Sequence, residues 1–350
     1  MNTAEDVLLP REQFRELCFA RDGHACVLCG QPAADAHHII ERRLFPDGGY
    51  YLGNAASVCP ACHIRCEQTV VSVEDVREAA GIRSVILPPH VYRDEGPYTK
   101  WLDQILPDGR RVPGELFYDE SVQKVLREGG VLPLYINRFK YPRTFHVPFS
   151  PGVGKDDRVL ESLAPFKGKR IVMTIKMDGE NTTIYSDGFT HARSLDTESH
   201  PSRNRVRALA AATGPQLPAG WRLCGENVYA KHAIHYQNLP SYFLMFSLWD
   251  DQNVCRSWDE TVEWAALLDL HTVPVLYDGL FDLDVVRDFY TPRDAQGEEV
   301  EGWVMRVADS FKYGDFRTSM AKYVRAGHVP EHGGHWKRAA VVVNGLGGGA

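Results

Sequence analysis

The sequence predicts an α+β protein that has a small zinc-stapled module at its start and a larger domain of strands and helices after it. Two observations predict this arrangement. Six of the eight cysteines lie within the first 66 residues, and four of them form two Cys-x-x-Cys pairs. Later in the chain, apolar runs of strand length alternate with segments of helical pattern. We place the module at 1–85, an ordered connector at 86–140 and the larger domain at 141–340.

Composition narrows the class of protein. The 350 residues carry a formal net charge of -7, which argues against a protein that coats nucleic acid non-specifically but allows local basic surfaces. The first residues lack the basic and apolar segments of a signal peptide, and the apolar runs are too short to span a bilayer. We therefore expect a soluble, cytoplasmic protein without a membrane partner. The oligomeric state stays open.

The module begins with a helical pattern over 10–20 and continues into two cysteine knuckles. A disulfide framework is typical of small secreted chains, whereas two Cys-x-x-Cys pairs supply four thiolates in two tight turns, which suits tetrahedral zinc. A redox-active or simply buried pair is the alternative. We expect a structural zinc ion at Cys26, Cys29, Cys59 and Cys62.

Histidine and asparagine residues lie between and directly after the knuckles, at His37, His38, Asn54 and His63. This arrangement resembles the HNH nuclease family, and the resemblance implies a ββα fold for the module. It implies that His38 is the general base that activates water and that Asn54 orients it. It also implies that His37 and His63 hold a catalytic divalent cation, magnesium or manganese, that polarises the scissile phosphate.

One residue departs from the family pattern. Many HNH enzymes carry aspartate at the position of His37, so the ligands here are neutral, which favours a softer metal such as manganese or nickel. The alternative is a zinc module that keeps the HNH shape but only binds nucleic acid or packs against its neighbour.

Capping residues mark a helix after the knuckles, with Ser72 as N-cap, Asp75 three residues on and Gly81 as the stop. The proline- and aromatic-rich connector contains a further helix at 119–128. Because Trp101 would be unusual in a solvated tether, we expect the connector to be ordered.

A short motif at the end of a predicted buried strand organises the larger domain. Residues 170–175 are β-branched and apolar, and Lys176-Met177-Asp178-Gly179 follows them directly. Burial lowers the pKa of a lysine, and a neutral amine is a nucleophile, so we expect Lys176 to be reactive.

The elements after this motif alternate between strand and helix. A hairpin turns at Asp187-Gly188 and brings Arg193 back towards the lysine. A helix over 201–212 presents a basic surface, and a strand from Arg222 ends near Glu226. A capping box at Ser257 opens another helix.

The ordered set of Lys176, Arg193, Glu226, Phe246, Glu301 and Lys322 resembles the motif series of the covalent nucleotidyltransferases, and within them the RNA-ligase family. The resemblance spans about 145–325. It implies a nucleotidyltransferase domain in which two antiparallel sheets, flanked by helices, hold ATP between them. The implied activity is that of an ATP-dependent polynucleotide ligase, which forms lysyl-AMP, transfers AMP to a 5'-phosphate and joins that end to a 3'-hydroxyl.

The resemblance also implies roles for individual residues. Lys176, which Asp178 and Gly179 follow in the motif, attacks the α-phosphate. Lys322 neutralises that phosphate and orients the pyrophosphate leaving group. Glu226 and Glu301 contact the ribose or hold the divalent cation. Arg193 holds a nucleotide phosphate or the incoming strand end, and Phe246 stacks on the adenine.

Several features near the end of the chain bear on this interpretation. The family commonly has a second lysine in its last motif, and Lys312 or Arg325 is the candidate substitute. Too few residues follow to build the OB-fold of DNA ligases and capping enzymes. We expect an ordinary loop around His328, His332 and His335, and a frayed tail over 345–350.

A nuclease fused to a ligase predicts trimming and resealing of nucleic acid. The substrate is RNA or DNA, as a single strand or a nicked duplex. One alternative is a ligase whose HNH module only binds nucleic acid. Another is a nuclease whose nucleotidyltransferase domain modifies protein or RNA ends without joining them.

Overall fold

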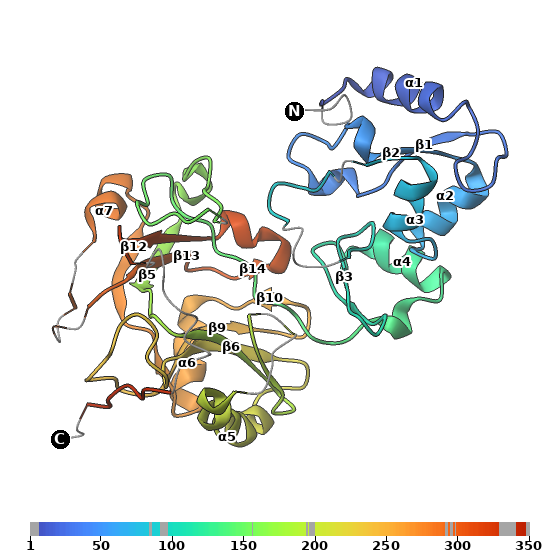
Figure 1. Cartoon of the computed structure of the whole chain (residues 1–350). Coiled ribbons are helices and arrows are strands. Elements are labelled where there is room, and N and C mark those ends of the chain that lie inside the picture. Colours follow the sequence, from blue (N-terminus) through green and yellow to red (C-terminus); the bar gives the residue numbers. More distant parts are fainter. Residues whose placement is uncertain are drawn as a thin grey trace. The chain divides into compact units, whose positions relative to one another are not determined.

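The computed structural model describes residues 7–83, 86–91, 97–155, 157–193, 195, 200–290, 293–294, 297, 299–328 and 341–347. The chain divides into two compact units, unit 1 at 1–139 and unit 2 at 140–350, and each has its own core (Figure 1). Among the described residues, no helix has the length and apolar character needed to cross a membrane.

Unit 1 starts with α1 (Arg11–Arg21), which covers a two-stranded sheet. In that sheet β1 (Asp35–His38) pairs antiparallel with β2 (Ala55–Val58), and α2 (Pro60–Glu67) follows directly and packs on β1. The order of these three elements is therefore ββα. The first helix forms as expected because its buried Phe14 and Cys18 lie four residues apart on one face.

The rest of unit 1 packs onto this centre. The helix α3 (Val73–Ala79) begins with the predicted capping box between Ser72 and Asp75. A short hairpin of β3 (Gln104–Ile105) and β4 (Arg111–Val112) precedes α4 (Glu120–Glu128). Trp101 is buried beside α4, and its indole N–H donates to the carbonyl oxygen of Glu67 at 2.9 Å, which ties the segment assigned to a connector to α2.

Unit 2 contains a seven-stranded sheet in the order β14-β10-β9-β8-β6-β7, with β11 pairing parallel to β9 and every other pair antiparallel. The predicted hairpin turn at Gly188 joins β6 to β7. The strands of this sheet are β6 (Glu180–Tyr185), β7 (Thr190–Ala192), β8 (Arg222–Asn227), β9 (Phe243–Trp249), β10 (Val254–Cys255), β11 (His271–Thr272) and β14 (Phe311–Lys312).

A second, four-stranded sheet of unit 2 is entirely antiparallel, in the order β12-β5-β13-β15. Its strands are β12 (Val275–Leu280), β5 (Arg170–Ile175), β13 (Gly302–Val307) and β15 (Met320–Val324). The strand β5 coincides with the predicted buried strand, and all of its residues after Arg170 are buried.

The two sheets share a core. Met173 of β5 and Met305 of β13 pack in one cluster with Cys224 of β8 and Trp249 of β9. The helices α5 (Asn204–Thr213) and α6 (Trp258–Leu267) pack on the other face of the seven-stranded sheet, as Figure 1 shows for α5, and α7 (Leu283–Asp288) contributes Val286 to the shared core. The protein is therefore a mixed α/β protein with antiparallel sheets.

Short 3-10 helices connect these elements, at Arg42–Leu44, Leu52–Asn54, Leu132–Leu134, Ala164–Phe166, Pro201–Arg203, Gly214–Gln216 and Tyr313–Thr318. The capping box predicted at Ser257 is present at the start of α6.

The expectation of a frayed glycine-rich tail is wrong for 345–347. Residues 341–347 form a strap across the segment 228–242. Asn344 is buried, its side-chain amide donates to the carbonyl of Val228 at 2.9 Å, and its side-chain oxygen accepts from the N–H of Tyr236 at 3.0 Å. The strap adds a bridge between Ala230 and Val343. These contacts order the tail because they satisfy backbone groups of both segments.

Candidate functional site

The structure places Lys176 directly after β5, at the end where β5 and β13 are paired. Its backbone N–H donates to the carbonyl of Gly302 at 2.9 Å, and its Nζ lies 2.6 Å from Oε1 of Glu301. Glu301 is buried, and a quarter of the Lys176 side chain is exposed. Two residues that are 125 positions apart therefore form one ion pair, because their strands are neighbours.

The expectation that burial leaves Lys176 with a low pKa is wrong for this structure. Burial does act to lower the pKa, but the carboxylates of Glu301 and Glu226 act in the opposite direction and the pKa is raised. The same surroundings affect the carboxyl of Glu226, whose burial, only partly offset by Lys176, raises its pKa to about 8. The site therefore holds an ammonium group next to the side chain of Glu301 and the weakly acidic carboxyl group of Glu226.

Asp178 and Gly179 fix the backbone after the lysine. The carboxylate of Asp178 accepts the backbone N–H groups of Ala233 at 2.7 Å and Ile234 at 2.6 Å. A Cβ atom at Gly179 would lie 2.7 Å from the carbonyl oxygen of Asn227 and 3.0 Å from Cγ of Glu226. Glycine is needed here because β8 passes so close, and that approach brings Glu226 towards Lys176.

His328 completes a group of possible metal ligands, which corrects its assignment to an ordinary loop. Its Nε2 lies 3.4 Å from Oε1 of Glu301 and 3.6 Å from Oδ1 of Asp178, and the side chain is buried. The ligand atoms of these three residues lie within 4.8 Å of one another. Two carboxylates and an imidazole suit manganese, and the carboxylates also suit magnesium. His332 and His335 lie outside the described residues.

Lys322 takes part in a second ion pair. Its Nζ lies 3.0 Å from Oδ1 of Asp157, and Oδ2 of Asp157 lies 3.2 Å from Nε2 of the buried His146. Burial lowers the pKa of Lys322 in spite of Asp157. Asp157 and His146 belong to no motif, and sequence reasoning missed both. Their place near Lys322 is seen in the structure, where the backbone of His146 forms a β-bridge with that of Lys322.

Two candidates could supply the second positive charge of the last motif, and the structure separates them. The backbone N–H of Arg325 donates to the carbonyl of Glu301 at 3.0 Å, and its guanidinium lies 3.2 Å from Oε2 of Glu299. Lys312 is exposed in β14, where it pairs with Val254 at the edge of the other sheet. Arg325 is therefore the residue next to the site.

Phe246 lies on β9 of the seven-stranded sheet, and Arg193 directly follows β7 of the same sheet. Phe246 is the extra residue of a β-bulge, because Cys224 pairs with Ser247 whereas Gly225 pairs with Met245. Its half-buried ring meets that of Tyr141 edge-on at 5.3 Å. Arg193 comes one residue after the Ala192–Thr182 pair, at the end of β6 that adjoins Gly179. The contacts of both residues with a nucleotide remain predictions.

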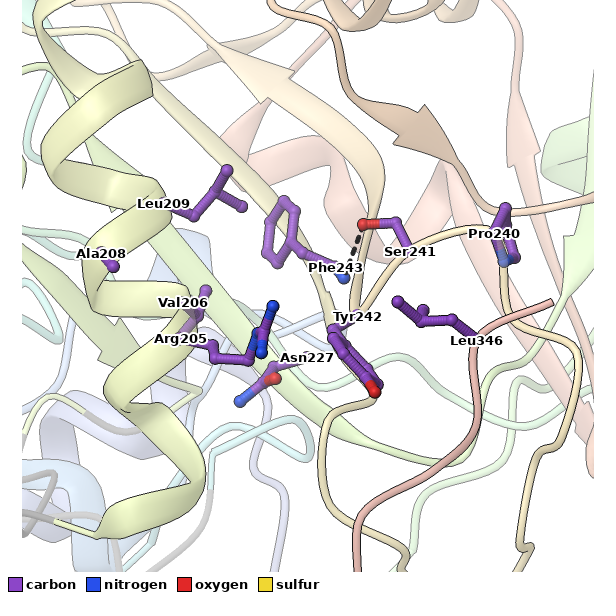
Figure 2. Close-up of a pocket in the computed structure, with 10 residues that line it drawn as sticks. All are labelled: Arg205, Val206, Ala208, Leu209, Asn227, Pro240, Ser241, Tyr242, Phe243 and Leu346. Atoms are coloured by element: carbon purple, nitrogen blue, oxygen red, sulfur yellow. Dashed lines mark hydrogen bonds between the residues drawn. The ribbon is translucent and has the colours of Figure 1, made fainter. Parts of the chain in front are cut away.

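The basic surface expected for the helix over 201–212 is only partly present. Arg203 is buried and forms an ion pair with Glu180. Arg205 lies over the ring of Tyr242 at 5.1 Å and lines a pocket of about 470 Å³. Figure 2 shows this pocket between α5 and the segment 240–243, with Leu346 of the strap at its side. This pocket is separate from the Lys176 site, since its lining comes from α5, Asn227, 240–243 and Leu346.

In unit 1, the four cysteines of the two knuckles converge. The sulfur atoms of Cys26, Cys29, Cys59 and Cys62 lie within 4.8 Å of one another, and those of Cys29 and Cys59 are 3.6 Å apart. Four sulfur ligands that converge in this way fit a tetrahedral zinc ion.

The two histidines assigned to a catalytic cation also lie together, and they share a carboxylate that sequence reasoning missed. Oε1 of Glu67 lies 3.1 Å from Nε2 of His63 and 3.5 Å from Nδ1 of His37. Burial, reinforced by Lys100, lowers the pKa of His37 to about 3, whereas Glu67 raises the pKa of His63. The signal for Glu67 was its position four residues after His63 on one helix, where the two side chains are neighbours.

His38 and Asn54 are the residues for which the resemblance implies the roles of general base and orienting amide. The His38 ring stacks on Phe14 at 4.6 Å, and burial lowers its pKa to about 4, so the imidazole is neutral. The amide of Asn54 donates to the carbonyl of Ile40 at 3.0 Å and accepts its N–H at 2.8 Å. Asn54 therefore fixes the chain two residues after His38. Its effect on a water molecule remains a prediction.

Comparison with known proteins shows what parts of this chain are similar to. No curated protein matches the sequence. Among solved structures, a variant of the Naegleria gruberi RNA ligase with ATP and Mn is 16% identical with a TM-score of 0.37, over 49% of this chain and 54% of that chain. The same ligase with PPi is 15% identical with a TM-score of 0.40, over 80% of this chain and 74% of that chain. In the first comparison the chain spans about half the length of the ligase.

The family model of RNA ligase matches residues 169–324. The matched segment begins one residue before β5 and ends with β15, so it contains every strand of the four-stranded and the seven-stranded sheet. The similarity of this chain to RNA ligases therefore covers the part of unit 2 that carries Lys176, Glu226, Glu301 and Lys322.

Proposed function

We propose that the protein is an ATP-dependent polynucleotide ligase that acts through a lysyl-AMP intermediate on Lys176. The observation that supports this most strongly is the 2.6 Å contact between Lys176 and Glu301, inside the segment that matches the RNA ligase family. Glu226 and Lys322 flank this pair from β8 and β15. The substrate is nucleic acid, RNA or DNA, as a single strand or a nicked duplex.

The first step forms a bond between Nζ of Lys176 and the α-phosphorus of ATP, after the ammonium has lost a proton. The bond from that phosphorus to the bridging oxygen of pyrophosphate breaks, and pyrophosphate leaves. Glu301 holds the amine in place before the attack, and Lys322 neutralises charge on the α-phosphate. Asp178, Glu301 and His328 could hold a divalent cation, magnesium or manganese, once the partly exposed Lys176 has lost its proton and turned from Glu301 towards the α-phosphate, and the cation would supply further positive charge to the phosphates.

The later steps need two strand ends near the same phosphorus. AMP moves from Lys176 to a 5'-phosphate, which restores the free lysine and leaves an activated end. A 3'-hydroxyl then attacks that 5'-phosphate, forms the phosphodiester bond and releases AMP. Arg193, at the end of the edge strand β7, is the residue that we assign to the incoming phosphate. Phe246 is assigned to the adenine.

A product assay tests this function. The full chain is incubated with ATP, Mg²⁺ or Mn²⁺ and 5'-labelled RNA or DNA, offered as single strands and as nicked duplexes. Joined or circular strands are expected, and Lys176→Met should abolish them, whereas Lys312→Met, a change in an exposed lysine of β14, should not. Adenylated strands that are never joined would support an end-modifying enzyme instead. No adenylated and no joined product on any substrate would refute the ligase.

For unit 1 we propose a structural zinc ion at the four cysteines, in a module that resembles HNH nucleases. Two functions remain for this module. The cluster of His37, His63 and Glu67 supports metal-dependent cleavage of a phosphodiester. The buried ammonium of Lys100, which also contacts Glu67, favours the alternative of a module that only binds nucleic acid.

Cleavage of single- and double-stranded DNA without ATP separates these two functions. The comparison is between the wild type and His38→Ala across magnesium, manganese and nickel. If the wild type cuts and His38→Ala does not, the module is a nuclease. If neither cuts, or both cut equally, the module binds nucleic acid or supports folding.

A further inference from the structure

A buried ammonium group lies where the HNH resemblance places a catalytic cation. Lys100 is 4% exposed. Its Nζ lies 3.2 Å from Oε1 of Glu67, 3.3 Å from Oε2 of Glu41 and 2.9 Å from the carbonyl oxygen of His38. An ammonium group has three N–H donors, and here three oxygen atoms lie within 3.3 Å of the nitrogen, in one hydrogen bond and two ion pairs. The group is therefore fully coordinated by the protein itself.

The backbone around Lys100 holds the ammonium in this position. The backbone N–H of Glu41 donates to the carbonyl of Lys100 at 3.0 Å. The next residue, Trp101, donates its indole N–H to the carbonyl of Glu67 at 2.9 Å. Both contacts tie the 99–103 turn to the residues whose carboxylates face Nζ. Lys100 could leave the site only by giving up two ion pairs and one hydrogen bond of a buried charge, which is costly.

The contact with Glu67 conflicts with metal binding. The oxygen that Lys100 contacts, Oε1, is the same atom that lies nearest His63 and His37. A metal bound to this oxygen and to an imidazole would lie about 2 Å from each ligand atom. Given the 3.2 Å from Oε1 to Nζ, the metal would lie within about 5 Å of the ammonium. In a buried site two cations at this separation repel each other strongly.

The residues present therefore do not fit the divalent cation that the resemblance implies, and we propose that Lys100 is an internal cation that closes the His37–His63–Glu67 site to divalent metals. The ammonium keeps the geometry of an HNH metal site without the metal. It neutralises Glu67 and Glu41 and orders β1 against α2. This inference rests on unit 1 alone and is independent of the ligase chemistry of unit 2.

Removal of the Lys100 charge should open this site to a metal. Without the ammonium, two imidazoles and a carboxylate face one another in a site that is already shaped. Such a ligand set takes manganese, cobalt or nickel in preference to magnesium. Lys100→Met keeps a similar length and removes the charge, so it should create a metal site that depends on His63.

Manganese binding to the full-length, zinc-loaded protein tests this, because free Mn²⁺ can be counted by electron paramagnetic resonance and thiolates do not favour it. In the wild type, His63→Ala should leave the Mn²⁺ titration unchanged, since any manganese then sits in unit 2. In Lys100→Met one additional site should appear, at least about tenfold tighter than any His63-dependent binding of the wild type. That site should disappear in Lys100→Met/His63→Ala. Lys124→Met, which alters an exposed lysine of α4, is the matched control and should behave as wild type.

Two results would overturn the proposal. The first is a His63-dependent manganese site in the wild type that is as tight as the site in Lys100→Met. The second is a folded Lys100→Met protein, with full zinc content and a native circular dichroism spectrum, that gains no His63-dependent site. If Lys100→Met does not fold, Lys100→Gln repeats the comparison with a side chain that can still donate to Glu67.

Discussion

Replacing Glu301 by glutamine should lower the pKa of Lys176, the proposed nucleophile. At the 2.6 Å separation of the two charged atoms, and with an effective dielectric constant of about 20, their attraction is about 6 kcal/mol. Burial of the lysine opposes this attraction, and the raised pKa of Lys176 means that the carboxylates outweigh burial. Glutamine keeps the shape and removes the charge. Burial, which lowers the pKa of Lys176, is then opposed by less negative charge, so the amine becomes neutral at lower pH.

Chemical labelling measures this directly, without ATP or metal. The full chain is treated with an acetylating reagent across a range of pH, and the extent of Lys176 modification is read by peptide mass spectrometry. The pH midpoint should fall in Glu301→Gln, and each pH unit of the fall corresponds to about 1.4 kcal/mol of lost interaction. Glu299→Gln, an exposed position two residues away, should leave the midpoint unchanged. An unchanged midpoint in Glu301→Gln would refute the dominance of this ion pair.

Three further predictions concern zinc, pH and the strap. Cys62→Ser should lose zinc by metal analysis and unfold unit 1, while unit 2 still melts as a unit, because structural zinc contributes folding energy. Glu226 has a pKa of about 8 in the folded protein, against 4.5 as its ordinary value. Its contribution to the stability of unit 2 is therefore complete below about pH 4.5 and is lost as pH rises towards 8. Glu226→Gln should therefore raise the melting temperature of unit 2 by about 10 °C at pH 8 and hardly at pH 4.5. Asn344→Ala should destabilise unit 2 by about 2–4 kcal/mol in urea unfolding, because two buried backbone groups lose their partner.

The zinc, Glu226 and Asn344 predictions each have a control variant or an outcome that would contradict them. Cys255→Ser, at a buried cysteine of unit 2, should retain zinc, and zinc retention in Cys62→Ser would contradict the four-thiolate site. A melting temperature of Glu226→Gln that tracks the wild type at every pH would contradict the raised pKa of Glu226. Val343→Ala changes an exposed neighbour of Asn344 in the strap and should be close to neutral, so equal losses in both variants would contradict the role of the Asn344 amide.

The sequence predicted those parts of the fold and site that depend on local patterns. The strand 170–175, the capping boxes at Ser72 and Ser257 and the turn at Gly188 follow from neighbouring residues alone, and the structure confirms them. The motif order also placed Lys176 and Glu301 in one site before their strands were known to be paired.

The rest depends on residues brought together from distant parts of the chain. Lys100 meets Glu67 and Glu41 across a loop that has no periodicity, and Asp157 meets Lys322 across 165 positions. No motif links these pairs. The sign of the pKa shift of Lys176 was missed for the same reason, since the sequence shows a buried strand but not the distance to the carboxylates that oppose burial.

The order of the strap over 341–347 could not be predicted from the sequence either. A glycine-rich end with few large side chains predicts fraying, because it can bury little apolar surface. In the structure the buried side-chain amide of Asn344 and backbone hydrogen bonds such as those from Asn344 to Tyr229 and from Gly345 to Tyr236 order the strap. Hydrogen bonds of this kind leave no pattern in composition or periodicity.

The central claim is that Lys176 becomes covalently bound to AMP. The direct measurement is incubation of the full chain with ATP labelled at the α-phosphate and with Mg²⁺ or Mn²⁺, followed by denaturing electrophoresis and mapping of the labelled peptide. A single labelled peptide that contains Lys176, lost in Lys176→Met and retained in Lys312→Met, is the predicted result. Label on another residue, or a labelled protein after Lys176→Met, would contradict the account.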